Sequence, residues 1–205
     1  MLIPLSVIHH KYNMKVSGVL HVGGHYGEEC TAYRTQGYTP VYWIEADSTS
    51  IPNLKKAVER YGQHVIEALV SDVPGDVTFN VANNGQSSSI LEFGTHSNEH
   101  PDVVFTGAKT LTATTIDILA EEGIIGPCNF MNLDIQGAEL MALKGGEKYL
   151  EGVDYIYTEV NRKELYKGCV LLPELDRWLS QKGFTRVELE MTIHGWGDAL
   201  YVRKT

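Results

Sequence analysis

Stretches with the composition of β-strands alternate with helical stretches along most of this chain. Strand-like runs, most of them apolar, occupy 18–23, 40–46, 64–71, 76–82, 128–135 and 153–160. Helical runs lie between or after them at 27–37, 50–62, 114–123, 138–146 and 171–184. Because a helix returns the chain between parallel strands, this order predicts an α/β fold with a mostly parallel sheet and helices on both faces. An antiparallel pair, 185–192 and 198–204, is predicted to end it.

One domain is predicted for the 205 residues, since neither a repeat nor a linker interrupts this order. Residues 1–17 precede the first strand and are assigned to an N-terminal lid or cap, in which 8–12 would fold over a pocket. The helix at 114–123 has a start signal, because Thr114 precedes Asp117 at the spacing of a capping box.

The composition narrows the classes of partner. There are 17 Lys and Arg against 26 Asp and Glu, a net charge of −9 without a basic cluster, so no nucleic-acid partner is expected. We find no apolar run of membrane-spanning length and no signal peptide. The three cysteines form no CxxC pair, which favours reduced thiols and a cytoplasmic protein.

A glycine-rich loop, GGHYG at 23–27, follows the first predicted strand. Its spacing is neither that of the dinucleotide fingerprint G-x-G-x-x-G nor that of a P-loop, which argues against an NAD-dependent reductase. The next helix opens with Glu28 and Glu29, which would repel a pyrophosphate at that helix end. A cofactor without phosphate fits this loop better.

Acidic residues follow the next two strands, at the sheet edge where α/β folds bind ligands. Glu45 ends the second strand, where a carboxylate can accept hydrogen bonds from both ribose hydroxyls. Ser71 and Asp72 follow the third strand and are expected to reach an adenine edge. A ribose without phosphate, next to a positive group and a glycine loop, describes S-adenosylmethionine. The predicted cofactor-binding residues are His21, Gly23, Gly24, His25, Gly27, Glu45, Ala46, Ser71, Asp72 and Asp134.

Several segments resemble the FkbM family of S-adenosylmethionine-dependent methyltransferases. They are GVLHVGGHYGEE, VYWIEADS, ALVSD, TTIDILAEEG, NFMNLDIQGAELMALKGGEKYL and YIYTEVN, and the resemblance spans roughly 18–203. The family pattern expected around the fifth segment is K-x-D-x-E-G-x-E. This chain has Asn132 in place of Lys and Gln136 in place of Glu, and His21 stands where Asp is common.

The resemblance implies the class I methyltransferase fold, a Rossmann-like, mostly parallel seven-stranded sheet with a C-terminal antiparallel pair. It also implies O-methyl transfer to a sugar, a glycan or another small hydroxylated metabolite. The family's association with carbohydrate decoration makes fusion to, or partnership with, glycosyltransferases an expectation.

Methyl transfer to a hydroxyl needs alignment of the two reactants and a base or a metal ion. Asp134 and Glu159 follow buried strands, and His194 lies between the last two strands, so these three are the catalytic candidates. Asp134 and Glu159, with Gln136, also offer oxygen ligands that suit Mg²⁺ or Ca²⁺. Candidate substrate-binding residues are Gln136, Asn161, Ser88 and Trp196, the last as a stacking face for a sugar.

Two alternatives stay open at this point. One is a degenerate methyltransferase fold that only binds a partner, which the replacements at His21, Asn132 and Gln136 favour. The intact glycines and Glu45 argue against it. The other is an O-methyltransferase of a small metabolite that is not a sugar.

Overall fold

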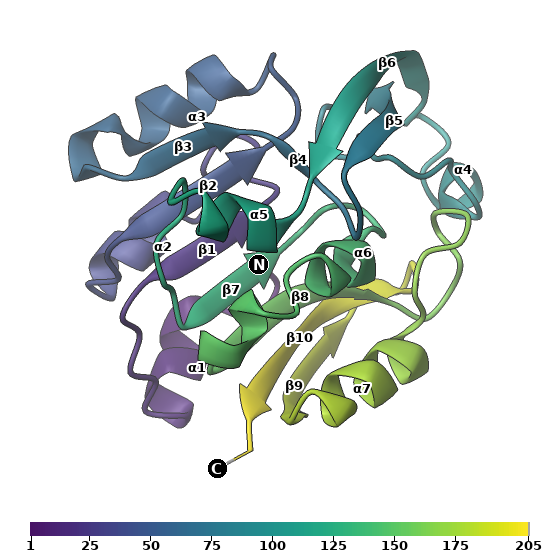
Figure 1. The fold of residues 1–205 in the computed structure, drawn as a ribbon. Coiled ribbons are helices and arrows are strands. Elements are labelled where there is room, and N and C mark those ends of the chain that lie inside the picture. Colours follow the sequence, from purple (N-terminus) through teal and green to yellow (C-terminus); the bar gives the residue numbers. More distant parts are fainter. Residues whose placement is uncertain (205) are drawn as a thin grey trace.

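The computed structural model describes residues 1–204, the side chain at position 60 excepted. A seven-stranded sheet runs through its centre in the order β3-β2-β1-β7-β8-β10-β9 (Figure 1). Its first five strands are parallel, and β10 is inserted antiparallel between β8 and β9. This arrangement confirms the predicted fold class. The strands are β1 Val19–Val22, β2 Val41–Glu45, β3 His64–Glu67, β7 Phe130–Leu133, β8 Tyr155–Asn161, β9 Phe184–Met191 and β10 Trp196–Arg203.

Helices cover both faces of this sheet because successive strand residues point to opposite sides. Val19 of β1 belongs to the hydrophobic cluster that holds α1 Leu5–Lys11, α2 Cys30–Thr35 and α3 Ile51–Val58. Leu20, the next residue, belongs to the cluster on the other face. The helices there are α5 Ile116–Glu121, α6 Glu139–Lys144 and α7 Leu172–Gln181. Two short 3₁₀ helices follow α3 and α6, at η1 Glu59–Tyr61 and η2 Tyr149–Gly152.

A second, three-stranded sheet was not predicted from the sequence. It consists of β4 Leu69–Val70, β6 Phe105–Thr114 and β5 Gly75–Ala82, in that order. The predicted strand at 64–71 is therefore wrong in extent, because the chain leaves the large sheet after Glu67 and pairs with β6 instead. The ribbon of β5 and β6 projects beside the large sheet, near the short helix α4 His96–Glu99 (Figure 1).

The start of α5 differs from the predicted capping box by one residue. Thr114 ends β6, and Thr115 is the N-cap, whose hydroxyl accepts a hydrogen bond from the amide of Ile118 at 3.1 Å. A Thr at either position fits the sequence pattern. Pairing of Thr114 with Val70 decides between them, because it holds Thr114 in extended backbone.

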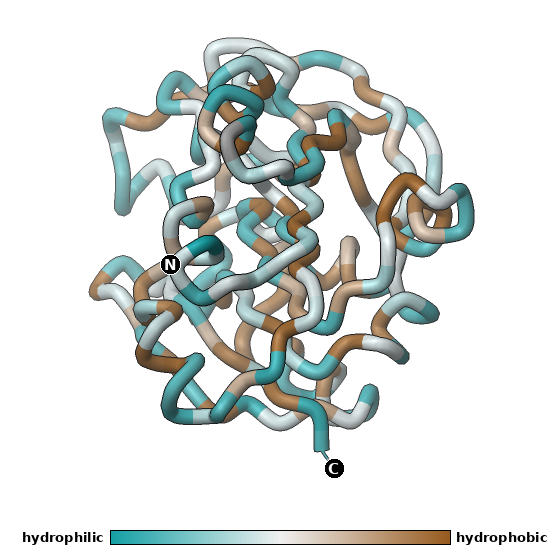
Figure 2. The backbone as a smooth tube through the Cα atoms, turned by 90° about the vertical axis from the view of Figure 1, so that its left-hand side faces the viewer, coloured by the Kyte–Doolittle hydropathy of each residue, from teal (hydrophilic) through white to brown (hydrophobic). Residues whose placement is uncertain are grey.

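The N-terminal segment packs against the sheet over most of its length. Leu5 and Ile8 of α1 are buried, and the hydroxyl of Tyr12 donates to the carbonyl of Val187 in β9 at 3.0 Å. Hydrophobic residues occur in short stretches along the whole chain (Figure 2). None of the helices within 1–204 combines the length and the apolar composition that a membrane crossing requires.

Candidate functional site

Two adjoining cavities open at the carboxyl ends of the central strands. The first, of about 80 Å³, is lined mainly by apolar side chains, among them Val22, Ile44, Leu69, Phe79, Ile90 and Ile135. The second, of about 440 Å³, has a largely polar wall that includes Glu29, Asn84, His96, His100, Glu159 and Asp198. They share Gly23, His25, Gln86, Asp134 and Gln136. These shared residues mark the point where groups bound in the two cavities would meet.

The glycine loop is held tightly between its neighbours. The amides of Gly23 and Gly24 both donate to the carbonyl of Ile44, at 2.9 and 3.0 Å. Gly23 has φ +91°, and a Cβ there would lie 1.9 Å from the carbonyl oxygen of Asp134. Gly24 and Gly27 pack against Leu54 of α3 and line neither cavity. Of the three predicted glycines, only Gly23 therefore lies at the cavity wall.

Glu45 ends β2 with its side chain buried at the wall of the first cavity. Its two carboxylate oxygens accept hydrogen bonds from the amides of His25 and Asp47, each at 2.7 Å. Burial raises the pKa of Glu45 above its usual value. Each oxygen keeps a second acceptor site, so the carboxylate can still receive two hydroxyl groups.

The third predicted strand end lies differently from the expectation. Ala46 lines the first cavity, but Ser71 and Asp72 line neither cavity. The hydroxyl of Ser71 instead donates to Asp72 at 3.1 Å. Because the chain turns into the second sheet, residues 68–70 form this part of the wall.

Asp134 follows β7 and lines both cavities. The side-chain amide of Gln136 donates to Asp134 at 2.7 Å and to Glu159 of β8 at 3.1 Å. Gln136 in turn accepts a hydrogen bond from the hydroxyl of Tyr166 at 2.7 Å. Gln136 has φ +56°, and these three contacts hold it in that uncommon conformation.

The carboxyl groups around Asp134 are shifted toward their neutral forms. Solvent reaches Asp134 through the cavity, but the surrounding protein limits its hydration, and this desolvation together with the charge of Asp198 raises its pKa to about 6. Burial and the charge of Asp134 raise the pKa of Glu159 well above its usual value. Burial and Asp134 likewise raise the pKa of Glu139 to about 7.

Sequence analysis missed the role of Glu139, although it is the last acidic residue of the family pattern. It accepts hydrogen bonds from the amides of Ile135 and Gly137, at 3.0 and 3.1 Å. These bonds fix the turn between β7 and α6, and they hold Asp134 and Gln136 in place. Gly137, with φ +95°, packs against Cys169 and Tyr166.

A divalent metal finds no support in this donor set. Within the described part of the chain, no three His, Cys, Asp or Glu side chains are arranged to hold a metal ion. The amide nitrogen of Gln136 lies between Asp134 and Glu159 and donates to both. A cation shared by the two carboxylates would have to displace it.

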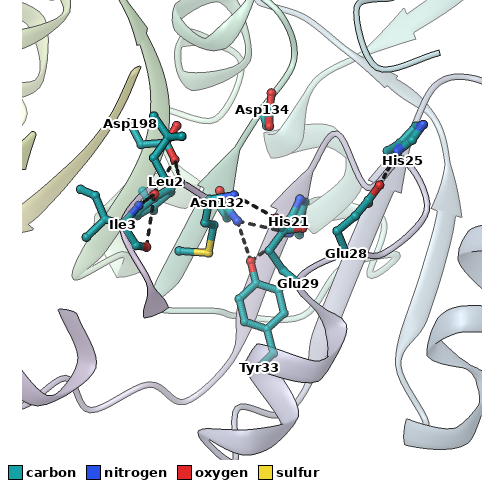
Figure 3. A network of polar contacts seen from close by, with 12 residues as sticks. Leu2, Ile3, His21, His25, Glu28, Glu29, Tyr33, Asn132, Asp134 and Asp198 are labelled. Carbon is teal, nitrogen blue, oxygen red and sulfur yellow. Dashed lines mark hydrogen bonds and ion pairs between the residues drawn. The ribbon is translucent and has the colours of Figure 1, made fainter. Parts of the chain in front are cut away.

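Two of the departures from the family pattern lie side by side. His21 of β1 and Asn132 of β7 are paired in the parallel register. Both are buried, and both contact the hydroxyl of Tyr33, His21 at 2.9 Å and Asn132 at 2.7 Å (Figure 3). Burial lowers the pKa of His21, which keeps the imidazole neutral. A neutral, hydrogen-bonded pair thus stands where the family pattern has a Lys and an Asp.

The far wall of the second cavity comes from α4 and β10. Trp196, the first residue of β10 and the predicted stacking face, lines this cavity. His96 is buried against Phe93, with ring centroids 4.3 Å apart, and its Nδ1 has no partner in the protein. Burial lowers the pKa of His96 to about 4, so the ring is neutral. Asp198 accepts hydrogen bonds from the amide of Leu2 (Figure 3) and from the hydroxyl of Tyr157.

Three further candidates lie away from the second cavity. His194 is paired with Glu99 at 3.1 Å and is absent from the wall. Asn161 is buried behind Glu159 and donates to it at 3.4 Å. Ser88 lines the first cavity, where its hydroxyl accepts a hydrogen bond from the amide of Ala82 at 3.0 Å.

Sequence analysis also missed His96, Tyr166 and Asp198. Each lies in a segment whose spacing shows no motif, and each reaches the second cavity only through the fold. A weak signal was present for Asp198, an acidic residue that precedes the apolar run 199–202 of the terminal strand. For His96 and Tyr166 we recognise no such signal in the sequence.

The comparisons with known proteins agree with this geometry. The model of the Methyltransferase FkbM domain matches residues 21–186. The 2-O-methyltransferase NoeI of Sinorhizobium fredii is 29% identical over 111 residues, which are 51% of this chain and 46% of that protein. The matched region thus spans less than half of that relative.

Solved structures share the fold at low identity. The magnesium protoporphyrin IX methyltransferase ChlM of Synechocystis, with bound S-adenosylhomocysteine, superposes with a TM-score of 0.55 at 12% identity, covering 97% of this chain and 80% of that one. The ribosomal protein L11 methylase of Lactobacillus delbrueckii has a TM-score of 0.52 at 12% identity, covering 98% and 77%.

Proposed function

Since this chain belongs to the FkbM family of S-adenosylmethionine-dependent methyltransferases, we propose that it transfers a methyl group to a hydroxyl of a sugar or glycan. One observation carries the proposal. Asp134 lines both the apolar cavity beside Glu45 and the larger polar cavity. A carboxylate at that junction can take the proton of a hydroxyl group while a cofactor occupies the other side.

The residues of the first cavity fit S-adenosylmethionine. Its apolar wall suits an adenine ring, and Glu45 has two acceptor sites left for the ribose hydroxyls. Nε2 of His25 is buried at the junction without a protein partner. The acidic groups around Asp134 suit a positively charged sulfonium. When bound, the cofactor supplies an electrophilic methyl group.

The chain itself contributes positioning and a base. The acceptor oxygen must lie in line with the methyl carbon, and the residues shared by the two cavities would hold the two reactants next to each other. Asp134 would accept the hydroxyl proton as the oxygen–methyl bond forms and the sulfur–methyl bond breaks, with S-adenosylhomocysteine as the leaving group. Gln136 orients Asp134 and Glu159 through its two hydrogen bonds, which leaves Glu159 to hold the acceptor.

A sugar is the acceptor class that this second cavity supports best. It offers Trp196 as an aromatic face, together with carboxylates, imidazoles and amides that can bind several hydroxyl groups. The related 2-O-methyltransferase NoeI points to hydroxyl oxygen as the methyl acceptor. A small hydroxylated metabolite other than a sugar is the second candidate, distinguished by the acceptor screen below.

The first test is calorimetric titration with S-adenosylmethionine and, separately, with NADH. We expect micromolar binding of the sulfonium cofactor and none of NADH. A screen of neutral mono- and oligosaccharides and hydroxylated metabolites, with mass spectrometry of the products, then identifies the acceptor. Lack of binding by both S-adenosylmethionine and S-adenosylhomocysteine would reject the enzyme and favour the degenerate binding module.

A further inference from the structure

We infer that the imidazole of His25 is the counter-ion for the α-carboxylate of the cofactor's methionine portion. The inference rests on the proposed function, and it assigns one residue of this chain to one charged group of the cofactor. It follows from where His25 lies, from which of its atoms are unpartnered, and from the scarcity of other cations around the cavities.

His25 lies between the ribose position and the junction of the cavities. Its backbone amide donates to Glu45, the residue expected to hold the ribose, at 2.7 Å. Its side chain lines both cavities. In the cofactor, the sulfur joins the ribose to the methionine chain, and the sulfur must face Asp134 for transfer. The amino-acid end is therefore expected within reach of the residues shared by both cavities.

The glycine loop has no backbone amide left for a carboxylate. All five amides of residues 23–27 already have acceptors in the protein, namely Ile44 for Gly23 and Gly24, Glu45 for His25, Glu28 for Tyr26, and Gly24 for Gly27. An anion at this loop must consequently be bound by side chains. This differs from loops whose free amides form an anion-binding nest.

Cations are scarce in these walls. Among the described residues, neither cavity is lined by Lys or Arg. His21 is neutral through burial and is bonded to Tyr33, and His100 lines only the second cavity. The amino group of Met1 is paired with Glu29 at 3.2 Å. The ammonium group of the cofactor's methionine portion would have several carboxylates nearby. Its carboxylate group would have the imidazole of His25 as its cationic partner.

The protonation and the fixed orientation of the His25 imidazole favour contact with a carboxylate. Nδ1 lies 2.6 Å from Glu28, and an ionised carboxylate can only accept, so Nδ1 carries a proton. Burial alone would lower the pKa of His25, but the hydrogen bond and charge of Glu28 outweigh it and raise that pKa. The ring stacks on Tyr26 with centroids 3.8 Å apart, which fixes its plane. Nε2 is buried and unpartnered, 3.3 Å from where a Cβ on Gly85 would lie.

The test compares ligands that differ by the carboxylate. Calorimetry is run with S-adenosylmethionine, with its decarboxylated form and with methylthioadenosine, on the wild-type chain and on His25→Asn. Asn tolerates positive φ, which matters because His25 has φ +39°. His100→Asn is the matched control, because it removes an imidazole from the second cavity only.

In the wild type we expect S-adenosylmethionine to bind at least about tenfold more tightly than its decarboxylated form, as a charged hydrogen bond would give. In His25→Asn this preference should fall below about twofold, while methylthioadenosine binds as before. An unchanged preference in His25→Asn would place the carboxylate on neutral side chains of residues 83–90 and overturn the inference. Equal affinities of the two ligands for the wild type would also overturn it.

The pH dependence of the preference for S-adenosylmethionine over its decarboxylated form gives a second readout. Charged groups near His25 are Glu28 in its own loop, Glu45 at the end of β2 and Asp134 after β7; residues 85–86, which also face it, are uncharged. Since only the protonated ring attracts the carboxylate, and Glu28 raises the pKa of His25, the preference should persist through the usual titration range of a histidine and weaken as pH rises above it. Methylthioadenosine should show no such trend. Failure of all three ligands to bind would reject the proposed function itself, which separates the two failures.

Discussion

The two cavities of this molecule are built in different ways. The first is formed where β1, β2 and β7 end, and its key contacts involve backbone groups, such as the amides held by Glu45. The second collects side chains from distant parts of the chain, from Leu2 to Asp198, and leaves Nδ1 of His96 unpartnered. Substitutions at the first cavity should therefore affect folding and cofactor affinity. Substitutions at the second should affect turnover and leave the fold intact.

The largest effect is expected for Gly23→Ala at the first cavity. The new Cβ would overlap the carbonyl oxygen of Asp134, in a backbone conformation that L residues rarely adopt. We expect a loss of about 4 kcal/mol or more in the free energy of unfolding, measured by urea denaturation. Gly37→Ala is the control, because Gly37 also has positive φ but would place its Cβ in open space. It should lose only about 1–2 kcal/mol, and equal losses would show that the loop relaxes.

Next in size is the effect of Asp134→Asn on turnover. Removing the base should lower the turnover rate about 10³-fold, as measured with saturating cofactor and the acceptor identified in the screen. The affinity for the cofactor should change only a few-fold. Glu190→Gln is the matched control. Glu190 is exposed, lies opposite Asp198 in the antiparallel register of β9 and β10, and lines neither cavity.

The pH profile checks the same assignment. Because the pKa of Asp134 is raised to about 6, the base is protonated below that value and ionised above it. The wild-type rate should rise as pH increases through about 6 and then level off. A profile unchanged in Asp134→Asn would remove Asp134 from the role of base.

The difference between the two cavities also explains which parts of the candidate site could be predicted from the sequence. The strands, and the positions of Gly23, Glu45 and Asp134 at the cavity walls, could be predicted because each strand end is local in sequence, and the sheet brings these ends together. The exit of the chain after Glu67 was missed, because the strand-like sequence HVIEALVS continues without a turn signal from β3 into β4. Ser71 and Asp72 were therefore expected at a wall that residues 68–70 form instead.

The second cavity was largely beyond sequence reasoning. Its contacts join segments separated by scores of residues, and no spacing rule connects them. The pairing of His21 with Asn132 is an example, because these two departures from the family pattern prove to be neighbours only once the register of β1 and β7 is known.

A smaller effect, mainly on cofactor affinity, is expected for Glu45→Gln. The side-chain amide would turn a donor toward the amide of His25 or of Asp47 and would hold one ribose hydroxyl less well. S-adenosylhomocysteine should bind about 10- to 100-fold more weakly, as measured by calorimetry, while turnover at saturating cofactor falls much less. Unchanged affinity would mean that the ribose lies elsewhere.

The smallest effect is expected for His194→Ala, outside the wall of the second cavity. His194 is partly exposed, is absent from the cavity wall, and contacts Glu99, which Lys163 also holds at 2.6 Å. An exposed pair of this kind is worth about 0–1 kcal/mol. Turnover should accordingly stay within about threefold, as measured in the acceptor assay used for Asp134→Asn. A loss as large as that of Asp134→Asn would make His194 the base, and the junction of the cavities would no longer be the place of proton transfer.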